Sequence, residues 1–406
     1  MHPSHDGHAP ALRSDAGRPD ATPADDPAGL GRPVPGDGRR PLWASVARLG
    51  GLFPAPGADH ASARPLLRGR GNPSGGWGAH GSLVRAAGSA GDRTGPRFDE
   101  AIPAGGYSWW YVDAISDDGQ HGLTIIAFLG SVFSPYYKAS GRGDPLNHCS
   151  LNVALYGPQA RWTMTERGSG AVARDASNLL IGPSSVHWDG EALTIDIHEG
   201  DSRLFVPWQR QVAGTVRVYP EALNRVAFAL DGRENHIWHC LAPRARIEVA
   251  MTSPGVSWSG KAYLDHNRGA EALEQGFNTW HWSRAHLNEG ALVCYEGERG
   301  DGSLFASTLR FDRDAVPEPV DLPPIAHLPR SKWGVARRTR SDIGVAEVRR
   351  TWEDTPFYAR SELASRFLGE EVVTVQESLD MQRFSSRIVQ FMLPYRMPRR
   401  EALSSL

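Results

Sequence analysis

Cysteine is scarce in this chain. Its 406 residues include three cysteines, Cys149, Cys240 and Cys294, which lie far apart and form no C-x-x-C pair. A structural zinc site or a disulfide framework needs cysteines in closely spaced or paired patterns. We therefore expect neither kind of site, and we expect a reducing compartment, the cytoplasm.

Long apolar runs and a large net charge are also missing. The longest apolar run, GLTIIAFLG (122–130), is too short to cross a bilayer and fits a buried strand. The first twenty residues lack the apolar core of a signal peptide. The formal net charge of −2 gives no reason to expect a nucleic-acid partner. Any contact with a membrane is therefore expected to be peripheral.

The signatures of the commoner enzyme classes are absent as well. The sequence contains no G-x-S-x-G nucleophile elbow, no Walker motif and no H-E-x-x-H zinc motif. One glycine-rich stretch, GLGRPVPGDG (29–38), has no strand before it, so it does not fit a dinucleotide-binding loop. His236 and His239 fall on opposite faces of a strand, and we predict no metal site.

The first 96 residues differ in composition from the rest. Residues 1–96 are dominated by Gly, Pro, Ala, Arg and Asp and show almost no apolar periodicity. Such a segment cannot bury enough surface to offset its ordering entropy, and we predict a disordered tail. The stretch 39–53, which contains Trp43, fits a short amphipathic helix that touches a membrane or a partner. The plainer interpretation of this stretch is an unstructured tail with a few stray apolar residues.

From Phe98 onward, short β-rich runs alternate with turn signals, which is typical of antiparallel hairpins. In ALTIDIHE (192–199) the side-chain period of two puts Leu193, Ile195 and Ile197 on one face. The pattern restarts after TSPGVS (252–257). We therefore predict an all-β fold. In this prediction a tail at 1–96 precedes a first β-domain at 97–254 and a second β-domain at 255–395.

Three strands of this pattern each place aromatic and polar side chains on one face. We expect these faces to meet in one cavity. The combination of the three faces is a more specific signal of a functional site than any one of the residues. The grouped residues are His236, Trp238 and Cys240 on the first strand, Tyr263 and Asp265 on the second, and Trp280, Trp282 and Arg284 on the third.

Each of these residues also has a plainer interpretation. Trp238 and Tyr263 are residue types that often fill a core, and Asp265 is of a type that often forms turns. Trp280 and Trp282 fit a core or a platform for sugar rings. Taken from the residues alone, these alternatives stay open.

Several long stretches resemble one known family, the bacterial carotenoid 1,2-hydratases, also called hydroxyneurosporene synthases. The resemblance extends over residues 98–395 and leaves the tail outside. The stretches that carry it are GGYSWWYVDAISDDGQHGLTIIAFLGSVFSPYY, HCSLNVALYGP, RWTMTER, HIWHCLAPRARIEVAM and GKAYLDHNRG.

The resemblance implies both an activity and a fold. The family adds water across the terminal 1,2 double bond of acyclic carotenoids such as lycopene and neurosporene, and it needs no cofactor. The resemblance implies a fold of two tandem lipocalin-like antiparallel β-barrels. It also implies four catalytic residues, which are His236 and Trp238 of HIW and Tyr263 and Asp265 of YLD.

These residue types suit the reaction. An aspartic acid kept neutral in an apolar pocket protonates the alkene, and aromatic faces stabilise the tertiary carbocation. In this scheme Asp265 is the acid, and His236 is the base that takes the proton of the attacking water.

The substrate implies an apolar binding site and a membrane. We expect Trp109, Trp280 and Trp282 to line the site, and we expect peripheral attachment to the cytoplasmic side of a membrane through a barrel mouth or the Trp43 segment. Two other functions remain alternatives, a non-catalytic lipocalin-like carrier of an apolar ligand and a carbohydrate-active protein with tryptophan platforms.

Overall fold

In the computed structural model, antiparallel strands make up most of the part of the protein that is described. The structure describes residues 84–85, 95–200 and 211–400. Over these residues the predicted β class is confirmed. The predicted disordered tail and the segment around Trp43 lie almost entirely outside the described residues.

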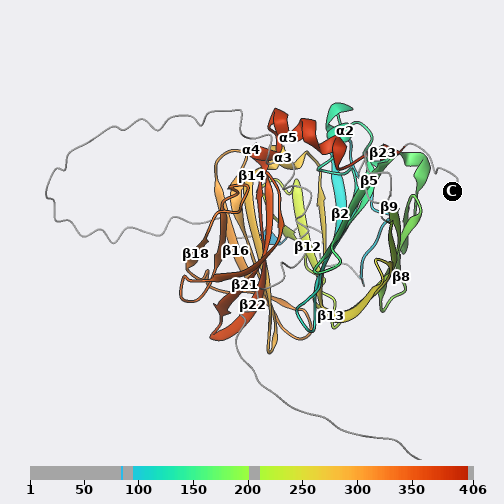
Figure 1. Ribbon diagram of the computed structural model, residues 1–406. Helices are drawn as coiled ribbons and strands as arrows, with labels where there is room; N and C mark the ends of the chain where they lie inside the picture. The colour runs from blue at the N-terminus through green and yellow to red at the C-terminus, as the bar shows by residue number, and fades with distance from the viewer. Residues whose placement is uncertain (1–83, 86–94, 201–210, 401–406) are drawn as a thin grey trace, which may run out of the picture. The chain divides into compact units, whose positions relative to one another are not determined.

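The larger of two main sheets has fourteen strands, and its central order is β4-β3-β2-β13-β12-β10 (Figure 1). Its strands are β1 (Val84–Arg85), β2 (Tyr107–Ser116), β3 (Gly122–Leu129), β4 (Cys149–Tyr156), β5 (Arg161–Arg167), β6 (Val172–Arg174), β7 (Asn178–Ile181), β8 (Ser184–Trp188), β9 (Leu193–Gly200), β10 (Gln211–Pro220), β11 (Phe228–Ala229), β12 (His236–Ser253), β13 (Val256–Gly269) and β23 (Arg399–Arg400).

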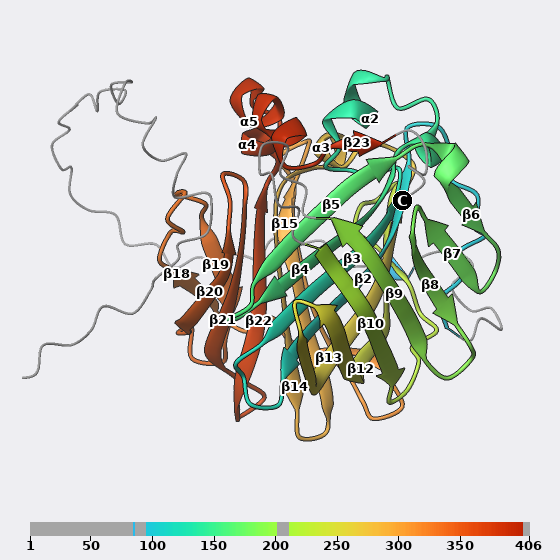
Figure 2. The same ribbon diagram turned by 45° about the vertical axis from the view of Figure 1, so that its right-hand side comes forward.

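This larger sheet curls back on itself, as Figure 2 shows. Arg167 of β5 and Glu199 of β9 lie far apart in the strand order, yet their side chains form an ion pair of 2.9 Å. The concave side holds an apolar core that includes Leu193, Ile195 and Ile197. The predicted alternation on this strand is confirmed, because the residues between them are only half-buried or exposed.

The second main sheet has the order β17-β16-β15-β14-β22-β21-β20, and a two-stranded sheet joins β18 to β19. The strands are β14 (Phe277–Leu287), β15 (Gly290–Arg299), β16 (Leu304–Phe311), β17 (Pro317–Pro319), β18 (Ile325–Leu328), β19 (Arg337–Arg340), β20 (Glu347–Asp354), β21 (Tyr358–Phe367) and β22 (Glu370–Asp380).

Short helices gather at one end of the sheets in both views (Figures 1 and 2). They are α2 (Pro135–Ala139), α3 (Leu273–Gly276), α4 (Met381–Phe384) and α5 (Arg387–Met392), with 3-10 turns η2 (Pro145–Asn147), η3 (Ser169–Ala171) and η4 (Leu393–Tyr395).

The predicted domain boundary at residue 254 falls in the turn between β12 and β13. Strand β13 was expected to open the second domain, but it pairs with β12 and β2 inside the larger sheet. Sheet membership changes further on, between Gly269 and Phe277. The division into domains 97–254 and 255–395 itself stays a prediction.

A buried layer of charged residues joins the two main sheets. Asp113 of β2 accepts a hydrogen bond of 2.5 Å from Nε of Arg284 on β14, and it also pairs with Arg360 on β21. Arg360 donates to Glu377 at 2.5 Å and to the hydroxyl of Tyr111 at 2.7 Å. Because these charges are almost completely buried, each depends on its partners for compensation.

This layer predicts a stability effect. We expect Asp113→Asn to lower the free energy of unfolding by about 3–5 kcal/mol, because it leaves buried guanidinium groups without their counter-charge. Urea denaturation measures the effect. Asp117→Asn is the matched control, since its ion pair with Arg246 is about half exposed, and we expect a change within about 1 kcal/mol. Equal losses in both variants would contradict the role of the layer.

Candidate active site

The predicted catalytic residues lie on two adjacent strands, β12 and β13, and β2 pairs with β13 on its other side. The strand register aligns their residues in cross-strand rows, and side chains two residues apart share a face. The first row is His236–Gly269–Tyr107, the second is Trp238–Asn267–Trp109, and the third is Cys240–Asp265–Tyr111.

The Asp265 carboxyl group is at the centre of a buried polar cluster. The residue is 4% exposed. Its Oδ2 accepts hydrogen bonds from Nε1 of Trp238 at 3.0 Å and from the hydroxyl of Tyr263 at 2.9 Å. Its Oδ1 accepts one from Nδ2 of Asn267 at 2.8 Å. The structure therefore brings together three of the four residues predicted from HIW and YLD.

Burial governs the protonation of this group. Loss of solvation raises the pKa of Asp265 to about 7, although the hydrogen bonds from Tyr263, Trp238 and Asn267 act in the opposite direction. The negative charge of Glu377 raises this pKa further. A carboxyl group with this pKa is available as a neutral acid near neutral pH.

His236 belongs to the same face but contacts a different set of residues. Its Nδ1 lies 2.8 Å from the hydroxyl of Tyr107, and its Nε2 lies 3.2 Å from a carboxylate oxygen of Glu271. It stands two rows from Asp265, about 13 Å along the strand direction. Burial lowers the pKa of His236, so the neutral imidazole is favoured.

The second main sheet supplies the opposite wall. The ring of Trp282 on β14 contacts the ring of Tyr263 edge-on, with 5.1 Å between the ring centroids. The ring centroids of Trp280 and of Trp109 on β2 are 6.3 Å apart. All three tryptophans predicted to line the site are buried in one aromatic cluster with Trp238. The candidate site therefore lies between the two main sheets. Within the described residues, Nε1 of Trp282 is buried without a hydrogen-bond partner.

Sequence reasoning missed several members of the site. Tyr107, Asn267 and Glu271 were not singled out, and Arg284 was grouped with the cavity although it binds Asp113 in the charged layer. The alternation in YSWWYVDAIS was a usable signal for Tyr107, since this residue shares a face with Trp109. Asn267 follows Asp265 by two residues, so the side-chain period of two also places it on the face of Asp265.

One group of residues has the spacing that a metal ion needs. Ligand atoms of Asp231, His236 and Glu271 lie within 4.8 Å of one another. Both ring nitrogens of His236 already have hydrogen-bond partners in Tyr107 and Glu271. The arrangement is therefore complete as a hydrogen-bonded network, and the absence of a metal stays a prediction.

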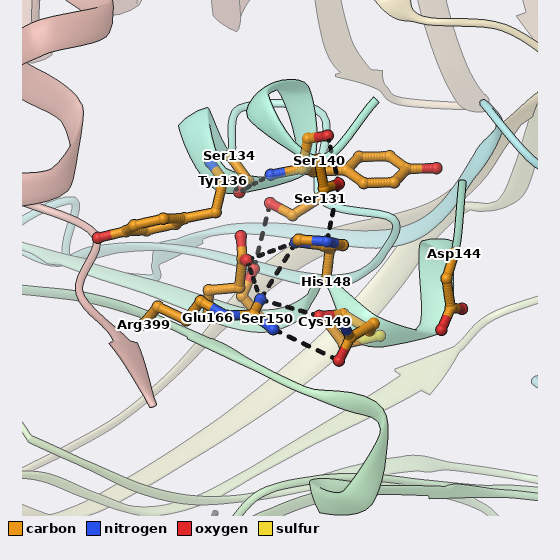
Figure 3. Close-up of polar contacts among 12 residues, drawn as sticks. Ser131, Ser134, Tyr136, Ser140, Asp144, His148, Cys149, Ser150, Glu166 and Arg399 are labelled. Atoms are coloured by element: carbon orange, nitrogen blue, oxygen red, sulfur yellow. Dashed lines mark hydrogen bonds and ion pairs between the residues drawn. The ribbon is translucent and has the colours of Figure 1, made fainter. Parts of the chain in front are cut away.

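A second polar cluster contains the residue types of a serine-hydrolase triad (Figure 3). Oγ of Ser140 lies 3.1 Å from Nε2 of His148, whose Nδ1 lies 2.7 Å from Glu166. However, Arg399 donates to the same Glu166 oxygen at 2.5 Å, and Ser140 donates its proton to the carbonyl of Tyr137. A serine bonded in this way is not activated as a nucleophile. The cluster instead fastens β23 beside β5.

Comparisons with known proteins agree on one family. A family model described as carotenoid hydratase CrtC matches residues 125–405. An acyclic carotenoid 1,2-hydratase from Thiocapsa roseopersicina is 48% identical over 90% of this chain and 91% of its own. A protein of the same name from Rubrivivax gelatinosus is 46% identical over 94% of this chain and 95% of its own.

Among solved structures, kievitone hydratase from Nectria haematococca aligns with a TM-score of 0.42 at 11% identity, over 74% of this chain and 96% of that one. The sequence matches confirm the family predicted above. The chain belongs to the carotenoid hydratase family.

Proposed function

We propose that this chain adds water to the terminal C1–C2 double bond of acyclic carotenoids such as lycopene and neurosporene, with Asp265 as the proton donor. Such an enzyme is a hydro-lyase, and its relatives carry the name of this activity. The observation that carries the proposed site is the buried carboxyl group of Asp265, whose pKa is raised to about 7. No cofactor takes part in the proposed reaction.

The hydrogen bonds around Asp265 indicate which oxygen carries the proton. The indole of Trp238 can only donate, and the hydroxyl of Tyr263 donates to the same Oδ2. The acidic proton therefore sits on Oδ1, beside Asn267. A half-turn of the Asn267 amide presents an acceptor to the neutral acid, and the reverse turn presents a donor to the carboxylate.

Transfer of this proton to C2 leaves a tertiary cation at C1. The π-faces of Trp238, Tyr263 and Trp282 stabilise such a cation, each by about 2 kcal/mol when water is excluded. The new carboxylate of Asp265 stays bound by three donors. These bonds lower its nucleophilicity, so the cation persists until water arrives rather than forming an ester.

His236 is proposed as the base of the capture step. Its neutral imidazole is able to accept a proton. The two rows that separate it from Asp265, about 13 Å along the strands, leave room for two reacting carbons and one water molecule. The acid and the base would then act from opposite ends of the reacting bond.

We also propose that Trp109, Trp280 and Trp282 line the polyene site, and that the two β-regions are tandem lipocalin-like barrels. All three side chains are buried in the aromatic cluster around the acid. Their apolar surfaces suit a hydrocarbon ligand.

The enzyme is proposed to work at the cytoplasmic surface of a membrane, where a carotenoid dissolves. No helix in residues 84–85, 95–200 and 211–400 is long and apolar enough to cross a bilayer. Ile388, Phe391 and Tyr395 on α5 and η4 expose 75%, 70% and 48% of their surface, and Arg387 beside them is exposed. Exposed apolar side chains next to a cation suit an anionic interface.

The first prediction concerns the acid. We expect Asp265→Asn to abolish hydration, because the amide cannot protonate C2, while carotenoid binding changes little. Anaerobic incubation with lycopene and neurosporene, followed by product analysis, measures the rate, and the carotenoid absorption spectrum measures binding. Wild-type turnover by the variant would remove Asp265 from the acid role, and binding without turnover by the wild-type protein would favour a carrier.

The second prediction concerns pH. The polyene has no ionisable group, so the pH profile of kcat reports the enzyme. Because the pKa of Asp265 is raised to about 7, the active neutral acid predominates below that pH and disappears above it. We expect kcat to fall about tenfold per pH unit above about 7. A rate that increases steadily from pH 6 to pH 8 would contradict the assignment.

The third prediction concerns the membrane. We expect the double variant Ile388→Ser/Phe391→Ser to lose sedimentation with vesicles of phosphatidylglycerol and phosphatidylcholine, while its turnover of detergent-solubilised lycopene is unchanged. Ile343→Ser/Val345→Ser is the matched control, since these residues are 62% and 63% exposed elsewhere. Equal binding by both double variants would exclude α5 as the docking element.

A further inference from the structure

We propose that Tyr107 is the residue that contacts the attacking water and passes its proton to His236, and that Glu271 is a positioning residue for that imidazole. The inference rests on the proposed hydration at Asp265 and adds the route by which water is deprotonated. It follows from the hydrogen bonds, the space and the solvent cleft around the first row.

The hydrogen bonds of His236 fix the direction of proton transfer. A carboxylate can only accept, so the Nε2 that faces Glu271 carries the hydrogen. In the neutral ring Nδ1 is then the acceptor, and the hydroxyl of Tyr107 donates to it at 2.8 Å. With both nitrogens engaged, the imidazole has no site left for water. The phenol oxygen of Tyr107 still has lone pairs that a water molecule can meet.

Two glycines make room for this arrangement. A Cβ atom at Gly276 would overlap Nε2 of His236, and one at Gly269 would overlap the ring of Tyr107. Gly269 is the middle residue of the first row, so its missing side chain lets Tyr107 and His236 meet above the sheet. Only glycine provides this space without displacing one of the two rings.

Tyr107 contacts the aromatic cluster and is also one of the residues that line a cleft. Its ring stacks on Trp109 at a centroid distance of 4.7 Å. It also lines a cleft of about 140 Å³, together with Ser108, Asn235 and Gly269. A water molecule occupies about 30 Å³ of liquid, so the cleft has room for a few. In the proposed scheme, the attacking water comes from this cleft, which borders the first row at Tyr107 and Gly269.

The capture step balances in atoms and charge. The oxygen of water forms a bond to C1 of the cation while one of its protons moves to the oxygen of Tyr107. The proton of Tyr107 moves to Nδ1 of His236, and the resulting imidazolium faces the carboxylate of Glu271. Asp265 has lost one proton and His236 has gained one, and exchange with solvent restores both.

The decisive experiment uses Tyr107→Phe with lycopene in D2O. The phenyl ring keeps the stacking on Trp109 but removes the hydroxyl. We expect kcat for hydration to fall about 10²–10⁴-fold with little change in KM. The cation still forms at Asp265 and reverts, so recovered lycopene should gain deuterium at C2. Asp265→Asn should show neither hydration nor exchange, which separates a failure of the relay from a failure of the proposed acid.

Two further variants complete the test. The Glu271→Gln variant should fold, because this side chain is 30% exposed. We expect its kcat to fall about tenfold or more, while its KM and the deuterium exchange at C2 stay unchanged. Tyr156→Phe is the matched control. It removes a buried hydroxyl that lies outside the relay and donates a hydrogen bond of 2.7 Å to Glu353, so its kcat should match the wild type.

Several outcomes would overturn the proposal. They are wild-type kcat in Tyr107→Phe or in Glu271→Gln, and loss of both hydration and deuterium exchange in a Tyr107→Phe protein that still binds lycopene. Activity that is lost on treatment with EDTA and restored by a divalent metal would also overturn it. Such a result would place a metal, rather than a proton relay, at His236.

Discussion

The site depends on one carboxyl group that is held out of water and yet surrounded by donors. Desolvation raises the pKa of Asp265, and the donors Trp238, Tyr263 and Asn267 limit the increase to about 7. The pKa of Asp265 is higher in the folded protein than in the unfolded chain. The proton on Asp265 therefore stabilises the folded state fully below about pH 4, and this stabilisation is lost as the pH rises through about 7. Keeping the ionised group buried then costs on the order of 4 kcal/mol.

Neither main sheet could create this environment alone. The larger sheet presents the three rows, in which Asp265, Asn267 and Gly269 form a floor between β12 and β2. The second sheet covers that floor with Trp280 and Trp282. The charged layer around Asp113 and Arg360 fixes one sheet against the other, and it meets the aromatic cluster at Tyr111, whose hydroxyl accepts a hydrogen bond from Arg360. The charged layer and the candidate site are thus adjoining parts of one interface.

The local sequence predicted which residues of the candidate site share a strand face. Because side chains on a strand alternate, the grouping of Tyr263 with Asp265, and of His236 with Trp238, followed from spacing alone. It did not show that Tyr107 meets His236, since these residues are 129 positions apart and β2 joins β13 across the sheet rather than along the chain. For the same reason the sequence did not show that β13 pairs with β2 in the larger sheet.

By itself, the sequence determined the β class, the alternation within strand β9 and the family, because these follow from short-range periodicity and contiguous motifs. The tertiary structure alone decided that Asp265 and His236 stand two rows apart, that Arg284 belongs to the charged layer, and that the candidate site lies between the two sheets. These features depend on strand register and sheet packing. Contacts between distant segments set both, and no local pattern encodes them.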